Sequence, residues 1–100
     1  MSNPVLFASF GTPDPDGAQA LEEYASSAVP LLTAVGAKPR VRAKVAEQLV
    51  GETELQTVFV VEFPSRESVD AVFDSDAYKA LIPARSKAFK TLHFLILEEF

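Results

Sequence analysis

The chain has 100 residues, of which 48% are hydrophobic; it contains no cysteine and one histidine, and its formal net charge is −5. The lack of cysteine excludes disulfides and thiolate chemistry, and a single histidine argues against a zinc site, which usually needs two or more His or Cys ligands. The acidic balance argues against a nucleic-acid partner, since a protein that neutralises phosphates needs a basic surface.

Targeting and cofactor signals are weak. The amino-terminal segment has no positively charged leader region, and no apolar run approaches the roughly 20 residues of a membrane span. We therefore expect a single domain, residues 1–100, located in the cytoplasm and without a membrane contact. Because Met1 is the only methionine, soft ligands are few, and we expect no metal or other cofactor.

The first half of the chain opens with an apolar run at 4–10 that predicts a strand. A helix with apolar residues at helical spacing should follow and end at Gly36. Asp14, which precedes a proline, is one candidate for its cap, and Asp16, at the head of a capping box, is another. Pro30 should bend this helix or divide it.

The middle of the chain predicts two strands. Residues 37–50 alternate between basic and apolar side chains at first, and Pro39 places this strand at an edge of the sheet. Residues 51–54 form a turn, and 55–63 form a strand rich in β-branched and aromatic residues. Strict alternation would put four cations on one face: Lys38, Arg40, Arg42 and Lys44.

The last third predicts short helices and a final strand. Pro64 ends the preceding strand, and Ser65 and Ser75 are the candidate caps of two successive helices. Residues 91–97 are the last predicted strand.

The resulting order is β-α-β-β-α-β, which predicts an α+β fold of the ferredoxin-like sandwich type. In that fold an antiparallel sheet carries its helices on one face. The first, third and fourth strands are apolar on both faces, so the other face also needs a cover. A second copy could supply it, and we therefore expect a homodimer that pairs through its sheets.

Two segments resemble a known family: GAKPRVRAKVAEQLVGE at 36–52 and VVEFPSRESVDAVFDSDAYKALIPAR at 60–85. They are similar to the domain-of-unknown-function 1330 family (DUF1330) of the dimeric α/β-barrel superfamily. The resemblance covers about residues 20–98 and implies a ferredoxin-like fold and a homodimer that encloses a barrel. The first helix departs from the family pattern, because Leu21 stands where a tyrosine is usual, while Tyr24 matches a later one.

Two polar residues on apolar strands are candidate catalytic groups. His93 is the only side chain whose ordinary pKa lies near neutral pH, so it is a candidate general base; alternatively, it is a partly buried histidine bonded to a neighbour. Glu62 is either an acid of raised pKa or a structural acceptor. Counting by twos, both side chains are expected to point into the barrel.

Arginines and tyrosines are the candidate substrate-binding groups. Arg85 follows Tyr78 on an otherwise apolar helix face and suggests a bound carboxylate, although an internal salt bridge to Glu62 or another acid is the favoured alternative. Arg42 is the basic-strand residue that the family pattern matches, whereas the other cations there protect an edge strand. Tyr24 and Tyr78 belong either to the site or to the core.

Two functions remain open on the sequence. The first is a cofactor-free enzyme of the proton-transfer, isomerase, cyclase or monooxygenase type, acting on a small apolar or aromatic acid in a dry cavity. The second is a non-catalytic homodimer that binds a small molecule or only has a structural role. The wider superfamily includes cofactor-free monooxygenases, cyclases, isomerases and haem enzymes, which is an analogy of fold and not of function.

Overall fold

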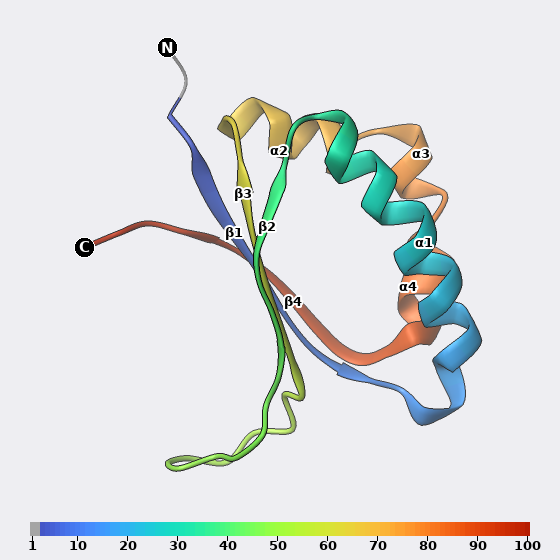
Figure 1. The fold of residues 1–100 in the computed structure, drawn as a ribbon. Coiled ribbons are helices and arrows are strands. Elements are labelled where there is room, and N and C mark those ends of the chain that lie inside the picture. The colour runs from blue at the N-terminus through green and yellow to red at the C-terminus, as the bar shows by residue number, and fades with distance from the viewer. Residues whose placement is uncertain (1–2) are drawn as a thin grey trace.

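In the computed structural model, which describes residues 3–100, four strands form one antiparallel sheet in the order β2-β3-β1-β4 (Figure 1). Met1, counted above among the soft ligands, lies outside the described residues. The elements are β1 (Val5–Pro13), η1 (Pro15–Gly17), α1 (Ala18–Ala34), β2 (Lys38–Lys44), β3 (Thr57–Phe63), α2 (Arg66–Phe73), α3 (Asp76–Lys79), α4 (Ile82–Ala88) and β4 (Phe89–Leu97). This is the predicted ferredoxin-like α+β arrangement, with the second helical connection divided into three short helices and β2 at an edge of the sheet.

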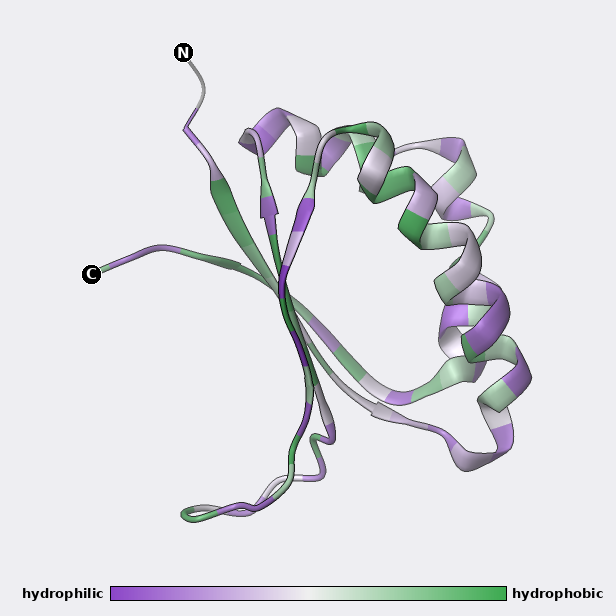
Figure 2. Ribbon diagram, viewed as in Figure 1, coloured by the Kyte–Doolittle hydropathy of each residue, from purple (hydrophilic) through white to green (hydrophobic). Residues whose placement is uncertain are grey.

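All the helices lie against one face of the sheet, here called the helix-facing side (Figure 1). On the opposite face, the uncovered side, no helix of residues 3–100 is packed. The loop at 45–56 and the carboxyl-terminal tail at 98–100 both project on the uncovered side. Figure 2 shows hydrophobic residues along the strands and at the tip of that loop.

The strand register assigns each side chain to a face. Phe7 pairs with Val61, and both are buried on the helix-facing side. Their neighbours along the strands therefore point to the uncovered side. That side is largely apolar and contains Leu6, Ala8, Phe10, Val41, Ala43, Val58, Val60, Leu95 and Leu97. The expectation that the strands are apolar on both faces is confirmed.

The first helical segment begins at the cap that Asp14 supplies. An Oδ1 atom of Asp14 accepts a hydrogen bond from the backbone N–H of Asp16 at 2.9 Å, which decides between the two predicted caps. α1 then runs from Ala18 to Ala34 with Pro30 inside it, so of the two predicted effects of Pro30, a bend or a division, the division is excluded.

Both predicted serine caps are present in the second helical connection. The Oγ atom of Ser65 accepts from the N–H of Ser68 at 3.2 Å in a reciprocal capping box that starts α2. The Oγ atom of Ser75 accepts from the N–H of Tyr78 at 3.1 Å and starts α3. Because α3 is one turn long, this cap fixes where the Tyr78 ring enters the core.

The buried core lies toward one end of the helix-facing side. It is built on Phe7, Val61 and Phe63, with Val69 and Val72 of α2 and Tyr78 of α3 packed onto them. Aromatic rings extend it along the sheet, since the Phe7 and Phe94 ring centroids lie 5.1 Å apart. Beyond Phe94, Arg85 and Ser86 stand beside the apolar side chains of Phe89 and Leu92, and the candidate site begins there.

Candidate functional site

The site starts from an arginine and a tyrosine on successive short helices. Tyr78 is only 2% exposed, and its ring packs edge-on against Phe73 with centroids 4.8 Å apart. Arg85 of α4 donates a hydrogen bond from Nη1 to the Tyr78 hydroxyl at 3.1 Å. Its Cζ atom lies 5.7 Å from the Tyr78 ring centroid and 5.6 Å from that of Phe94. The guanidinium is thus held in place by one hydrogen bond and two aromatic faces.

Tyr24 of α1 completes this group of three side chains. Its hydroxyl oxygen lies 2.7 Å from that of Tyr78, and its ring stands edge-on to Phe89 with centroids 6.3 Å apart. Burial and the hydrogen bond to Tyr78 raise the pKa of Tyr24 well above its ordinary value, and nearby Arg85 only partly opposes this. Tyr24 therefore stays a neutral phenol at physiological pH.

A pocket of about 290 Å³ opens beside this group, between α4 and the helix-facing side of β4. Arg85 and Ser86 supply its polar wall, and Phe89, Leu92 and Phe94 supply its apolar wall. Ligand pockets usually measure roughly 300–1,000 Å³, so this one suits a single small ring with a polar substituent.

Gly11 of β1 lies directly under the apolar wall. A Cβ atom at this position would stand 3.0 Å from the Phe89 ring and 3.1 Å from the Leu92 side chain. The absence of a side chain at Gly11 therefore lets these two walls settle against the strand and leaves room in the pocket.

The internal salt bridge predicted for Arg85 is not formed. Among residues 3–100, no carboxylate forms an ion pair with Arg85, whereas Glu62 pairs with Arg40 at 2.8 Å. The reason is the face that each residue occupies: Glu62 pairs in register with Leu6 on the uncovered side, and Arg85 stands on the other side of the sheet.

The two candidate catalytic residues share the uncovered side, as expected from the count by twos, but they lie far apart. His93 pairs with Phe10 and is exposed, while Glu62 pairs with Leu6 at the far end of β1. Four residues of strand separate these two rows, which is roughly 14 Å. His93 and Glu62 therefore lie close neither to each other nor to the pocket beside Arg85.

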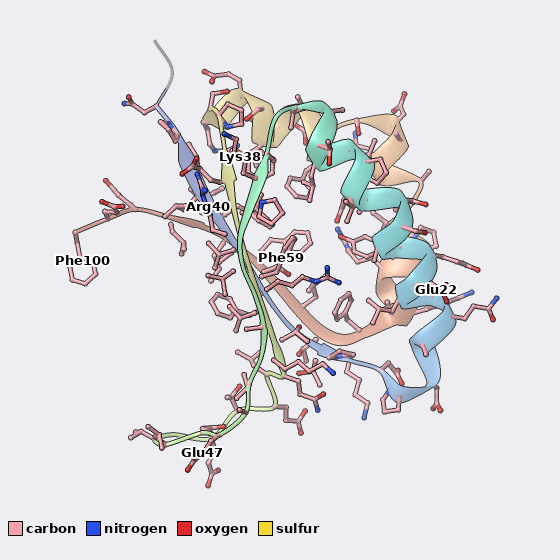
Figure 3. The ribbon with its side chains drawn as sticks, in the orientation of Figure 1. Glu22, Lys38, Arg40, Glu47, Phe59 and Phe100 are labelled. Atoms are coloured by element: carbon pink, nitrogen blue, oxygen red, sulfur yellow. The ribbon has the colours of Figure 1, made fainter. Side chains whose placement is uncertain are left out.

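The prediction that four cations share one face of β2 is wrong. Lys38 pairs with Glu62 and Pro39 with Val61, but the register then shifts, so that Arg42 pairs with Phe59. A β-bulge at Arg40 causes the shift and inverts the alternation beyond it. Lys38 and Arg40 lie on the uncovered side (Figure 3). Arg42 and Lys44 lie on the helix-facing side.

Sequence reasoning found Tyr24, Tyr78 and Arg85, which the structure gathers into one cluster. It missed Ser86, Phe89, Leu92 and Phe94 as lining residues. A signal for Leu92 and Phe94 was present, because they alternate along the last strand with His93. Nothing in the sequence, however, said which of the two alternating sets faces the helices.

Other kinds of site have little support over the described part of the chain. Within residues 3–100, no group of three or more His, Asp or Glu side chains is placed to hold a metal ion. No helix there is long and apolar enough to cross a membrane.

Comparisons with known proteins give a family and a fold. The family model described as "Domain of unknown function (DUF1330)" matches residues 10–100. No curated protein matches the sequence. A protein of unknown function from Rhodopseudomonas palustris has a similar structure, with a TM-score of 0.86 and 19% identity over 100% of this chain and 85% of that chain.

Two more distant structures share the fold. A conserved protein from Methanosarcina mazei gives a TM-score of 0.70 at 14% identity, covering 98% of this chain and 94% of that one. A variant of SnoaB, a cofactor-independent oxygenase from Streptomyces nogalater, gives 0.67 at 10% identity over 98% and 94%. At such identities the likeness concerns the fold alone.

Proposed function

Since the chain belongs to the DUF1330 family, whose description assigns no activity, we propose a function from the pocket itself. The domain binds a small aromatic or apolar acid, which lies against Phe89, Leu92 and Phe94 while Arg85 holds its anionic group. No cofactor is part of this proposal.

The observation that carries the proposal is the state of the Arg85 guanidinium. It is half-buried against two aromatic rings, its one hydrogen bond within residues 3–100 goes to Tyr78, and it forms no ion pair with any carboxylate there. A cation taken partly out of water is costly unless an anion compensates it. Arginine presents several donors in a planar fork, so most of its donors remain available to a bound carboxylate.

Binding is a better-supported function than turnover. Proton-transfer catalysis needs a group that exchanges a proton near neutral pH. Among the described residues that line the pocket, arginine stays protonated, serine needs an activating base, and the remaining three are apolar. The enzyme predicted from the sequence is therefore the second candidate, with SnoaB, a cofactor-independent oxygenase, as a relative in fold only.

We also infer that two copies pair through their uncovered sides. Val41, Leu95 and Leu97 are 44%, 47% and 38% exposed there, and a specific interface typically buries over 1,000 Å². The loop at 45–56 and the tail ending in Phe100 project on the same side and would meet the second copy (Figure 3). Their tips carry the strongly exposed residues Leu49, Val50 and Phe100.

Benzoate tests the ligand class, with benzamide as its neutral analogue. Benzoate should raise the melting temperature in proportion to the logarithm of its concentration, and benzamide should not. Arg85→Gln should abolish the benzoate effect. Lys87→Gln, which removes the same charge from the same helix outside the pocket lining, should retain it. Equal stabilisation by both compounds, or an Arg85→Gln variant that still responds to benzoate, would refute the proposal.

A further inference from the structure

A second cation lies on the same side of the sheet as Arg85. Because of the β-bulge at Arg40, Arg42 pairs with Phe59, and the Phe59 ring packs against the core on the helix-facing side. Figure 3 shows Phe59 on that side and Arg40 on the other. The bulge thus moves Arg42 to the side of the sheet on which the pocket lies.

One row of residues across the sheet connects the two arginines. Arg42 pairs with Phe59, Phe59 with Ser9, and Ser9 with Phe94. Phe94 lines the pocket and lies under the guanidinium of Arg85. Three strand spacings, roughly 14 Å, separate the Cα atoms of Arg42 and Phe94, and the long side chain of Arg42 shortens this gap from its end.

The row between Arg42 and the pocket is largely apolar, and the pocket lining reaches its far end at Phe94. Phe59 and Phe94 supply aromatic faces, and Ser9 between them supplies one hydroxyl. The adjacent row also runs from the pocket to a cation on β2. Leu92 of the pocket pairs with Gly11, Gly11 pairs with Thr57, and Thr57 pairs with Lys44. The helix-facing side therefore offers cations at both ends of a largely apolar floor.

Nothing in the described part of the chain neutralises these cations. Over residues 3–100 the ion pairs are Arg40 with Glu62 and Arg66 with Asp70, and neither involves Arg42 or Arg85. The protein has 14 acidic residues and 9 basic ones, so acids are not scarce. A charge on either face of β2 would protect this edge strand from unwanted pairing, so that role does not explain why Arg42 lies on the helix-facing side.

We propose that the ligand is a dianion, a flat aromatic or rigid apolar acid with a second acid group at its far end. Arg85 holds the inner acid group, and Arg42 holds the outer one at the β2 edge. This inference rests on the proposed function, to which it adds the second charge and the residue that recognises it. Since Arg42 is exposed, its share of the attraction should weaken with added salt more than that of Arg85.

Titrations with terephthalate and benzoate into the full chain at low salt test the inference. Terephthalate should bind about tenfold tighter than benzoate, and added salt should narrow this difference. Arg42→Ala should remove this difference by weakening terephthalate binding far more than benzoate binding. Lys38→Ala takes the same charge from the same strand but from the uncovered side, so it should keep the difference.

The possible failures are distinguishable. The inference is wrong if both acids bind the unaltered chain equally well. It is also wrong if Lys38→Ala reduces the difference in affinity between terephthalate and benzoate as much as Arg42→Ala does, because Arg42 then does not bind the second acid group. The proposed function stands in both cases. If neither acid binds, the proposed function and the inference both fail.

Discussion

The hydroxyl oxygens of Tyr24 and Tyr78 lie 2.7 Å apart, although 54 positions separate the two residues in the chain. Arginine can only donate, so the Tyr78 oxygen accepts the hydrogen bond from Arg85. Between the two phenols, one hydroxyl donates its proton to the oxygen of the other. The three side chains come from α1, α3 and α4. Their hydrogen bonds therefore tie three helices together at the point where the core ends and the pocket begins.

The raised pKa of Tyr24 predicts a loss of stability at high pH. In the unfolded chain Tyr24 titrates near its ordinary pKa of 10.0, whereas in the folded chain burial and the bond to Tyr78 keep it protonated to higher pH. Above pH 10 the unfolded state therefore binds fewer protons than the folded state, and the free energy of unfolding falls as pH rises. The stability gained is complete below pH 10 and is lost as pH rises toward the folded pKa.

Tyr24→Phe should remove this contribution. At neutral pH the variant should lose about 1 kcal/mol with the hydrogen bond, and above pH 10 its stability should fall less steeply than that of the unaltered chain. Urea denaturation across this pH range measures both effects. Parallel curves above pH 10 would show that Tyr24 titrates alike in both states.

His93→Gln and Glu62→Gln should leave benzoate binding unchanged. Both residues lie on the uncovered side, whereas the pocket lies on the helix-facing side. Glu62→Gln should also cost less than about 1 kcal/mol of stability in the single chain, because its ion pair with Arg40 is partly exposed. Calorimetric titration of each variant measures the affinity for benzoate. A large loss of affinity in either variant would indicate that benzoate binds near His93 or Glu62 and not in the pocket beside Arg85.

If two copies pair as proposed, Leu95→Lys should keep the chain monomeric. Leu95 is 47% exposed in the single chain and lies on the uncovered side of the edge strand β4, opposite Ala8. Burying an unpaired ammonium between two sheets is unfavourable. Light scattering of the unaltered chain should give about twice 10.8 kDa, and that of the variant about 10.8 kDa.

Val29→Lys is the control for this charge. Val29 is 52% exposed on α1, away from the uncovered side, so this variant should stay dimeric. An unaltered chain that is monomeric and well folded at micromolar concentration would rule out the pairing.

Local hydrogen bonds made part of the fold predictable from sequence. The caps at Asp14, Ser65 and Ser75 depend on residues two or three positions away, so a short pattern is enough to place them. The order of the strands and helices could also be predicted, because apolar periodicity likewise depends on residues that are close together in the sequence.

Long-range pairing set the limit of prediction. The bulge at Arg40 depends on how β2 aligns with β3, and the sequence of β2 alone predicts unbroken alternation. The cluster at the pocket has the same origin. Tyr24 and Arg85 could each be singled out by residue type, but only the packing of α1 against α4 brings them to the same phenol.

Gly11→Ala should weaken benzoate binding by several-fold with little loss of stability. The new methyl group would stand 3.0 Å from the Phe89 ring and 3.1 Å from the Leu92 side chain, so both walls must move by a few tenths of an ångström toward the pocket. The side chains in the way are movable, and an alanine also restricts the unfolded chain, so the two effects on stability partly cancel.

Gly36→Ala is the matched control. Gly36 has a φ of +80°, and an added Cβ atom would stand 3.5 Å from Pro64, so the backbone conformation alone should lower the stability of this variant by about 1 kcal/mol and leave the affinity for benzoate unchanged. Titration and urea denaturation of both variants separate the two properties. If Gly11→Ala binds benzoate as tightly as the unaltered chain, the ring of the ligand does not lie against Phe89 and Leu92.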